Sequence, residues 1–241
     1  MENTENNFDY IFTERNYLIS KTRTLPTPNH YALSLLEEYP KNAFDEEKVL
    51  QYKGKWHEKA FDVSKDSPMD LEIGTGNGFH FANYVETNPN RPIIGLELKY
   101  KPLIQTVRRT LDTGNSKFVM ARYDARVIQN LFEKDEVDNV YIHFPDPWAK
   151  KASTEKNRLV QVPFLKKLYE IQKKGSFVDF KTDHPGYFEC VKEVLKHVPY
   201  TIERISDDLH NSKWASENFQ THFEKLWTSK GLKSHYIRFY K

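Results

Sequence analysis

The chain has 241 residues, of which 38% are hydrophobic, 29% charged and 14% aromatic, a composition typical of one soluble globular domain with a short appendage. The formal net charge of +2 gives little support for a nucleic-acid partner, although local basic clusters remain candidates for phosphate contacts. No segment reaches the ~18–20 apolar residues of a membrane helix, and the N-terminus has no signal-peptide character. The single cysteine, Cys190, excludes an internal disulfide. We therefore expect a cytoplasmic protein.

The first part of the chain has a different character from the rest. Residues 15–28 mix basic, aromatic and proline residues, which indicates an arm without a core of its own. A short helix is predicted from Tyr31 to Glu38, ended by Tyr39-Pro40. We expect an N-terminal arm and short helix over residues 1–45, partly mobile, and one main domain over residues 46–241. The polar stretch 41–68 is predicted to be partly helical and packed onto that domain.

From Met69 onward, apolar strand patterns alternate with helical patterns. This alternation predicts an α/β fold, with a seven-stranded mostly parallel sheet, helices on both faces and an antiparallel strand among the last ones. Ligands of such sheets lie beyond the carboxyl ends of the strands. The predicted strands are residues 69–74, 92–98, 117–125, 138–144, 175–183, 200–206 and 234–241, and the predicted helices are 77–89, 102–114, 158–175 and 185–198.

A glycine-rich loop follows the first of these strands. It contains Gly74, Gly76 and Gly78, and glycines let the backbone turn tightly and approach a ligand closely. A dinucleotide fingerprint has glycine or alanine where this chain has Phe79, so pyrophosphate binding fits poorly. A plain tight turn is the alternative.

Acidic residues stand at the ends of successive strands. Glu97 lies about twenty residues beyond the loop, where a nucleotide site places its ribose-binding carboxylate. Asp124, followed by Ala125, is placed to receive an adenine amine, and Asp146 ends the fourth strand between two prolines. Each acid alone is also compatible with a solvated loop or a helix cap. Together with Glu72 they predict one crevice lined with acids.

This constellation resembles the Rossmann-like class I S-adenosylmethionine-dependent methyltransferases. In that family the glycine loop holds the methionine moiety, the acid after the second strand holds the ribose, and the acid after the third strand reads the adenine. A sulfonium cofactor without phosphate suits acidic groups. The resemblance therefore implies S-adenosyl-L-methionine as cofactor.

The stretch "FPDPWAKK" narrows the resemblance to the tRNA (guanine-N7)-methyltransferases of the bacterial single-chain type. The segments "LEIGTGNG", "IIGLELK", "FKTDH" and "ENFQTHFEKLWTSKG" follow the same family in order, and "RTLPTPNHYALSLLEEYP" matches its N-terminal segment more loosely. The resemblance covers nearly the whole chain. It implies methyl transfer to N7 of the variable-loop guanine of tRNA, position 46.

The resemblance also assigns roles to individual residues. Asp146 is implied as the catalytic residue, and no metal site is expected because the histidines lack metal-ligand spacing. The residues implied on the cofactor side are Glu72, Gly74, Gly76, Gly78, Glu97, Asp124, Ala125 and Asp146, and those implied to contact the RNA are Lys150, Asp183, Thr221, Phe223 and Glu224.

The chain departs from the family pattern in two places. Relatives commonly carry a dense His/Arg run after the tryptophan and lysines, where this chain has "ASTEKN". Phe223 stands where tyrosine is common, which removes a hydroxyl and keeps the ring.

Several of these residues have a structural alternative. Trp148 would either stack on a base or pack as a hydrophobic plug beside the loop. Asp183 would either position the substrate or cap the next helix. Thr221 and Glu224 have the spacing of a capping box, which is compatible with RNA contact at the same helix end.

We also retain two other functions as alternatives. One is a class I methyltransferase that acts on another RNA or on a small molecule, and the other is a non-catalytic RNA-binding subunit. The expected partner is tRNA, with no DNA and no membrane partner, and the chain is expected to be a monomer or a homodimer.

Overall fold

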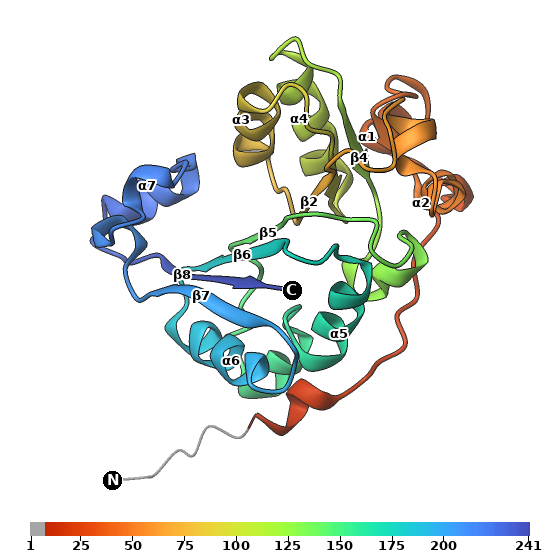
Figure 1. The fold of residues 1–241 in the computed structure, drawn as a ribbon. Coiled ribbons are helices and arrows are strands. Elements are labelled where there is room, and N and C mark those ends of the chain that lie inside the picture. The colour runs from red at the N-terminus through yellow and green to blue at the C-terminus, as the bar shows by residue number, and fades with distance from the viewer. Residues whose placement is uncertain (1–7) are drawn as a thin grey trace, which may run out of the picture.

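The computed structural model describes residues 8–241. Its centre is one sheet of eight strands in the order β1-β4-β3-β2-β5-β6-β8-β7, in which β8 is the antiparallel member (Figure 1). All seven predicted strands are present. The strands are β1 Ala43–Phe44, β2 Asp70–Ile73, β3 Ile93–Leu96, β4 Phe118–Ala121, β5 Val140–His143, β6 Phe177–Thr182, β7 Thr201–Ser206 and β8 His235–Tyr240.

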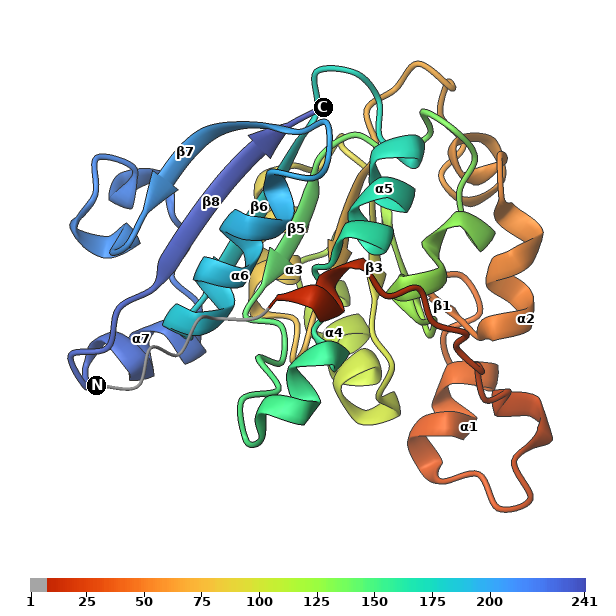
Figure 2. The same ribbon diagram turned by 90° about the horizontal axis from the view of Figure 1, so that it is seen from below.

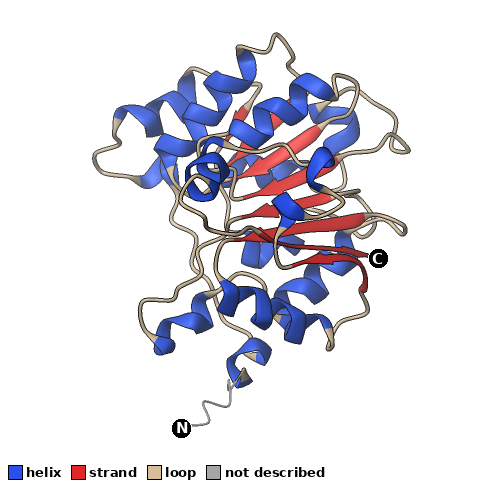
Figure 3. Ribbon diagram, turned by 90° about the vertical axis from the view of Figure 1, so that its left-hand side faces the viewer, coloured by secondary structure: helices blue, strands red, loops and turns tan. Residues whose placement is uncertain are grey.

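Helices cover both faces of this sheet, as the sequence predicted (Figure 3). Helices α1, α3 and α4 lie on one face, over the half that contains β2, β3 and β4, and α5 and α6 lie on the other (Figure 1). The helices are α1 His30–Glu37, α2 Glu46–Val49, α3 Phe79–Thr87, α4 Tyr100–Leu111, α5 Val162–Ile171, α6 Pro185–Leu195 and α7 His222–Thr228.

The eighth strand, β1, comes from the polar stretch that was predicted to be partly helical. Ala43 and Phe44 pair with Met120 and Ala121 and extend the sheet beyond β4. The same stretch contains α2 and the helical turn Trp56–Ala60, and Trp56 is fully buried with its indole N–H donated to the carbonyl of Leu131. The stretch is therefore packed onto the domain, and the sheet includes residues before position 45.

The N-terminal segment runs along α5 and then towards α1 and α2 (Figure 2). Ile11 is fully buried in the main core, and Thr22 donates both its N–H and its hydroxyl to the Glu46 carboxylate. The segment thus contributes to the core of the domain. The first seven residues of the predicted arm lie outside the described part of the chain.

The parallel strands end in register. Ile73 pairs with Leu96, Leu96 with Ala121, and His143 with Lys181, so the loops that follow β2, β3, β4, β5 and β6 emerge at one edge of the sheet. This is the edge where an open α/β sheet binds its ligands. None of the helices within residues 8–241 has the length and apolar content that crossing a bilayer would require.

Candidate active site

The glycine loop follows β2 and begins α3. Gly74, Gly76 and Gly78 have φ angles of +76°, +55° and +76°, a region that side chains disfavour. A Cβ added at Gly74 or Gly76 would meet nothing within 4 Å, whereas one at Gly78 would lie 2.6 Å from Oγ1 of Thr106 in α4. Gly78 therefore permits close packing of the loop against α4, and Gly74 and Gly76 leave open space at the crevice.

Glu97 follows β3 and is hydrogen-bonded to the glycine loop. Its carboxylate accepts the N–H of Gly76 at 3.1 Å and the N–H of Lys99 at 2.9 Å. Burial raises the pKa of Glu97, and the backbone N–H groups around it oppose that shift. Each oxygen retains a lone pair, so the carboxylate can still accept hydrogen bonds from a ligand's hydroxyl groups.

Asp124 follows β4 and caps a short helical segment, Ala125–Asn130. Its carboxylate accepts the N–H of Arg126 and both Nε–H and Nη2–H of the same guanidinium, at 2.9 and 2.5 Å. That guanidinium lies 3.8 Å from the ring centroid of Tyr17 in the N-terminal segment. The helix cap considered from sequence is thus present, and a ligand amine at Asp124 would share the carboxylate with Arg126. Ala125 is buried.

Glu72 lies inside the sheet and not at its rim. Its side chain is 3% exposed, and Oε2 lies 2.7 Å from Nδ1 of His80 in the first turn of α3. His80 in turn contacts His143, with ring centroids 4.4 Å apart. The side chain of Glu72 is therefore held by α3, on the face of the sheet that this helix partly covers.

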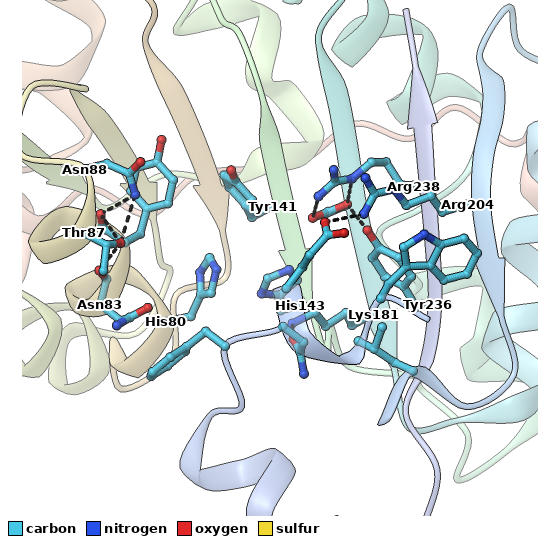
Figure 4. A pocket seen from close by; sticks show the side chains of 17 residues that line it. His80, Asn83, Thr87, Asn88, Tyr141, His143, Lys181, Arg204, Tyr236 and Arg238 are labelled. Atoms are coloured by element: carbon cyan, nitrogen blue, oxygen red, sulfur yellow. Dashed lines mark hydrogen bonds and ion pairs between the residues drawn. The ribbon is translucent and has the colours of Figure 1, made fainter. Parts of the chain in front are cut away.

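That face carries a cavity of about 250 Å³ beside α3, over β5, β6 and β8 (Figure 4). Asp179 is held there by both Nε and Nη2 of Arg238 at 2.7 Å and by the Tyr236 hydroxyl. The ring nitrogens of His143 have no hydrogen-bond partner among the described residues, and burial holds the pKa of His143 well below its usual value. No sequence pattern indicates this cavity, because its lining residues are spread along the chain from His80 to Arg238.

Asp146 stands on an exposed turn after β5. Its Oδ1 accepts the N–H of Trp148 at 2.9 Å. Phe144 and Trp148 have φ angles of +51° and +49°, a conformation that costs about 1–3 kcal/mol for residues other than glycine. Such strain persists only where surrounding contacts hold it. Trp148 is 40% exposed, and Lys150 and Lys151 are exposed beside it.

Asp183 follows β6 and does not cap the next helix. The N-cap of α6 is His184, whose Nδ1 accepts the N–H of Tyr187 at 3.1 Å, so the capping role considered for Asp183 is wrong. The Asp183 carboxylate is half-buried and has no hydrogen-bond partner within the described part of the chain.

The predicted capping box of α7 is present. Glu224 N–H donates to Oγ1 of Thr221 at 3.2 Å, and Thr221 N–H donates to Oε2 of Glu224 at 2.9 Å. Glu224 is fully buried, and its Oε1 accepts from Asn218 at 3.1 Å and lies 3.7 Å from Nζ of Lys181. Phe223 is 41% exposed and contacts Phe144 with ring centroids 5.2 Å apart. The start of α7 thus lies beside the turn that carries Asp146.

Lys181 in β6 contacts the start of α7 from inside the sheet. It is 4% exposed and donates to Oδ1 of Asn218. Burial lowers the pKa of Lys181, and the nearby carboxylates of Glu224 and Asp179 oppose that shift. The strand alternation of "FVDFKTD" places this lysine on the same face as Asp179, which is the one available signal of its role.

A glycine loop, a carboxylate at Glu97 and a stiff acidic turn at one sheet edge define a Rossmann-like methyltransferase. Solved structures share the fold, namely an antibiotic-related methyltransferase (TM-score 0.51, 20% identity, 77% of this chain and 97% of that chain) and an rRNA methylase from Streptococcus thermophilus (TM-score 0.51, 10% identity, 73% and 87%). Residues 66–237 match the family described as "Putative methyltransferase".

Curated relatives narrow this class. The chain is 43% identical over 209 residues to a tRNA (guanine-N(7)-)-methyltransferase of Bdellovibrio bacteriovorus, covering 87% of this chain and 100% of the relative. It is 34% identical to the enzyme of the same name from Bacillus subtilis, over 75% of this chain and 82% of the relative. The chain belongs to the tRNA (guanine-N7)-methyltransferase family.

Proposed function

We propose that this enzyme transfers the methyl group of S-adenosyl-L-methionine to N7 of the variable-loop guanine of tRNA. The observation that carries the proposal is the Asp146 turn, which presents an exposed carboxylate, oriented by the N–H of Trp148, at the edge where the glycine loop opens. The family membership supports the same reaction.

The residues around the glycine loop fit a sulfonium nucleoside. The open space at Gly74 and Gly76 admits a ligand close to the backbone, and Glu97 offers carboxylate oxygens to ribose hydroxyls. Asp124 and Ala125 follow the third strand of the nucleoside crevice, on the adenine side. The bound cofactor would supply an electrophilic methyl group on a sulfonium. Glu72, 2.7 Å from Nδ1 of His80, lies in β2 two residues before Gly74.

Guanine N7 has a lone pair and no proton at neutral pH, so the reaction requires no general base. The main task of the protein is to align N7 with the methyl carbon and the sulfur, and alignment can contribute ~7–11 kcal/mol. Asp146 would accept hydrogen bonds from the guanine N1–H and N2 amine and stabilise the positive charge that develops on the ring. The flanking Pro145 and Pro147 restrict the backbone, so this carboxylate stays fixed.

The tRNA would bind across the rim that Asp146, Asp183 and α7 share. Lys150 and its neighbour Lys151 are exposed and suited to phosphate contacts. Thr221, Phe223 and Glu224 begin α7, where Phe223 offers an exposed ring for stacking and Glu224 holds the helix start in place. The buried free thiol of Cys190 fits a reducing compartment such as the cytoplasm.

The direct test is methyl transfer from labelled S-adenosyl-L-methionine to an unmodified tRNA transcript. Borohydride reduction followed by aniline cleaves RNA at N7-methylguanosine, and we expect one cleavage site in the variable loop. Transfer to another RNA or to a small metabolite in place of tRNA would indicate a different substrate for the same fold. tRNA binding without any methyl transfer would indicate a non-catalytic subunit.

A further inference from the structure

Asp146 and Arg158 bind opposite ends of the same peptide group. The N–H of Trp148 donates to Oδ1 of Asp146 at 2.9 Å. The carbonyl of that peptide belongs to Pro147 and accepts Nε–H of Arg158, also at 2.9 Å. One planar unit therefore connects the guanidinium with the proposed catalytic carboxylate.

Arg158 is buried and donates hydrogen bonds from Nε and Nη1, whereas Nη2 has no hydrogen bond to any described residue. It is 2% exposed, its Nη1 donates to the Tyr10 hydroxyl at 2.9 Å, and its Nη2 lies 3.1 Å from Oε1 of Glu155. Its guanidinium lies 5.0 Å from the ring centroid of Tyr187 in α6. A planar guanidinium with several donors in fixed directions can satisfy these partners at once, whereas a lysine ammonium is a single point of charge.

The peptide that Arg158 holds leads into a backbone conformation that is intrinsically disfavoured. Trp148 adopts a positive φ of 49°, and its own carbonyl lies 2.6 Å from Oγ1 of Thr154, whose one hydroxyl hydrogen is shared with the carbonyl of Lys151 at the same distance. Without the bond to the Pro147 carbonyl, rotation of the 147–148 peptide would carry the N–H away from Asp146. The carboxylate would then lose the donor that sets its direction.

We propose that Arg158 is a positioning residue for methyl transfer, acting on Asp146 through the 147–148 peptide and linked by Tyr10 to the N-terminal segment. The inference rests on the proposed function of Asp146. It assigns to a buried arginine a role in the rate of the chemical step, while the cofactor side of the crevice remains unaffected.

The primary test is Arg158→Lys, with Arg91→Lys as the matched control. Arg91 also forms a bidentate pair, with Asp70 at 2.7 Å, but it precedes β3 at the opposite edge of the sheet. We expect Arg158→Lys to lower the single-turnover rate of methyl transfer about 10-fold or more, with the Kd for S-adenosyl-L-methionine within about 2-fold of wild type. Arg91→Lys should leave that rate within about 2-fold.

A double-mutant cycle with Asp146→Ala separates positioning from a general loss of structure. If Arg158 acts through Asp146, adding Arg158→Lys to Asp146→Ala should cause no further loss of rate. Tyr10→Phe, which removes the hydroxyl that Arg158 contacts, should lower the rate less than Arg158→Lys. Millimolar guanidinium ion should partly restore the rate of Arg158→Ala.

A wild-type single-turnover rate in Arg158→Lys would overturn the proposal. It would also be overturned if Arg158→Lys lowered the rate by the same factor in the wild-type protein and in Asp146→Ala. A loss accompanied by equally weakened cofactor binding would assign Arg158 a structural role only and would also overturn it. If Asp146→Ala itself transferred methyl groups like wild type, the proposed role of Asp146 would fail first. That result is distinguishable because it does not involve Arg158.

Discussion

The two sides of the crevice are built differently. On the cofactor side, defined as the loop Gly74 to Gly78 with Glu97, the contacts join segments of one continuous stretch of the chain, such as the N–H of Gly76 donated to Glu97, 21 positions further on. On the substrate side, defined as the Asp146 turn, Lys181 and α7, side chains from distant parts of the chain hold the backbone. Arg158 donates to the Pro147 carbonyl and to the hydroxyl of Tyr10, which lies 148 positions before Arg158.

This difference has a consequence for specificity. A site held by contacts within one stretch of the chain is largely formed before any ligand arrives. A site held by long-range side-chain contacts can change with the N-terminal segment or with α7 while the cofactor side remains the same. Changes on the substrate side should therefore alter rate or RNA binding, and changes on the cofactor side should alter cofactor affinity or folding.

The largest expected effect is on the substrate side, from Asp146→Ala. We expect methyl transfer to fall about 10²–10³-fold, because the variant loses the carboxylate that faces the developing positive charge. Since Asp146 is exposed, the melting temperature should stay close to wild type. The exposed Asp66→Ala, before β2, is the control and should keep full activity. If Asp146→Ala turned over like wild type, Asp146 would not have the role in methyl transfer that is assigned to it.

On the cofactor side, Gly78→Ala tests the tight packing of the loop. A methyl group at this position would lie 2.6 Å from Oγ1 of Thr106, and φ is +76°. We expect a loss of about 2–4 kcal/mol in the free energy of unfolding, measured with urea. The matched control is Gly114→Ala, where φ is +78° and nothing lies within 4 Å, with an expected loss of about 1–2 kcal/mol. Equal losses in both variants would contradict the packing role.

Cofactor affinity should also depend on pH through Glu97. Hydrogen bonds from ribose hydroxyls favour the ionised carboxylate, and burial raises its pKa above the ordinary value. The affinity should therefore fall as the solution is acidified, beginning at a higher pH than an ordinary glutamate would give, by up to about 10-fold per pH unit below that pKa. Calorimetric titrations between neutral and acidic pH measure this.

The control for that titration is Glu97→Gln. It cannot ionise, so it should bind more weakly at neutral pH and lose the acid-dependent part of the affinity. An identical pH dependence in wild type and Glu97→Gln would assign the titration to another group.

The smallest expected effect is on the substrate side, at the capping box of α7. Thr221→Ala removes the hydroxyl that accepts the N–H of Glu224 and should cost about 1 kcal/mol of local helix stability. We expect weaker tRNA binding and unchanged affinity for S-adenosyl-L-methionine. Thr221→Ser keeps the cap and serves as the control. Weaker cofactor binding in the alanine variant would contradict the separation of the two sides.

The sequence was informative wherever a feature depends on neighbouring residues. Strand–helix alternation predicted the seven main strands, glycine spacing predicted the turn after β2, and Thr-x-x-Glu predicted the cap of α7. The two-residue strand β1 was missed because it is too short to show a periodic pattern. The strand is defined only by its pairing with β4, which is distant in the sequence.

The features that were not predicted depend on long-range contacts. Arg158 resembles a surface residue of a basic segment, and only the fold shows that it is buried against Tyr10 and Pro147. From the sequence, Lys181 resembles a solvent-facing polar residue of a strand. In the fold it is buried, and its Nζ lies near the carboxylate of Glu224. The positive φ of Trp148 has no local sequence signal, because glycine, the usual residue in that conformation, is absent.

The most direct test of the account replaces the variable-loop guanine of a synthetic tRNA by 7-deazaguanine. This base keeps N1–H and the N2 amine, which Asp146 would bind, but it has carbon where the nucleophilic nitrogen would be. We predict no methyl transfer to this tRNA, together with competitive inhibition of transfer to the unmodified tRNA. Methyl transfer to the 7-deaza tRNA at the wild-type rate would contradict the central claim.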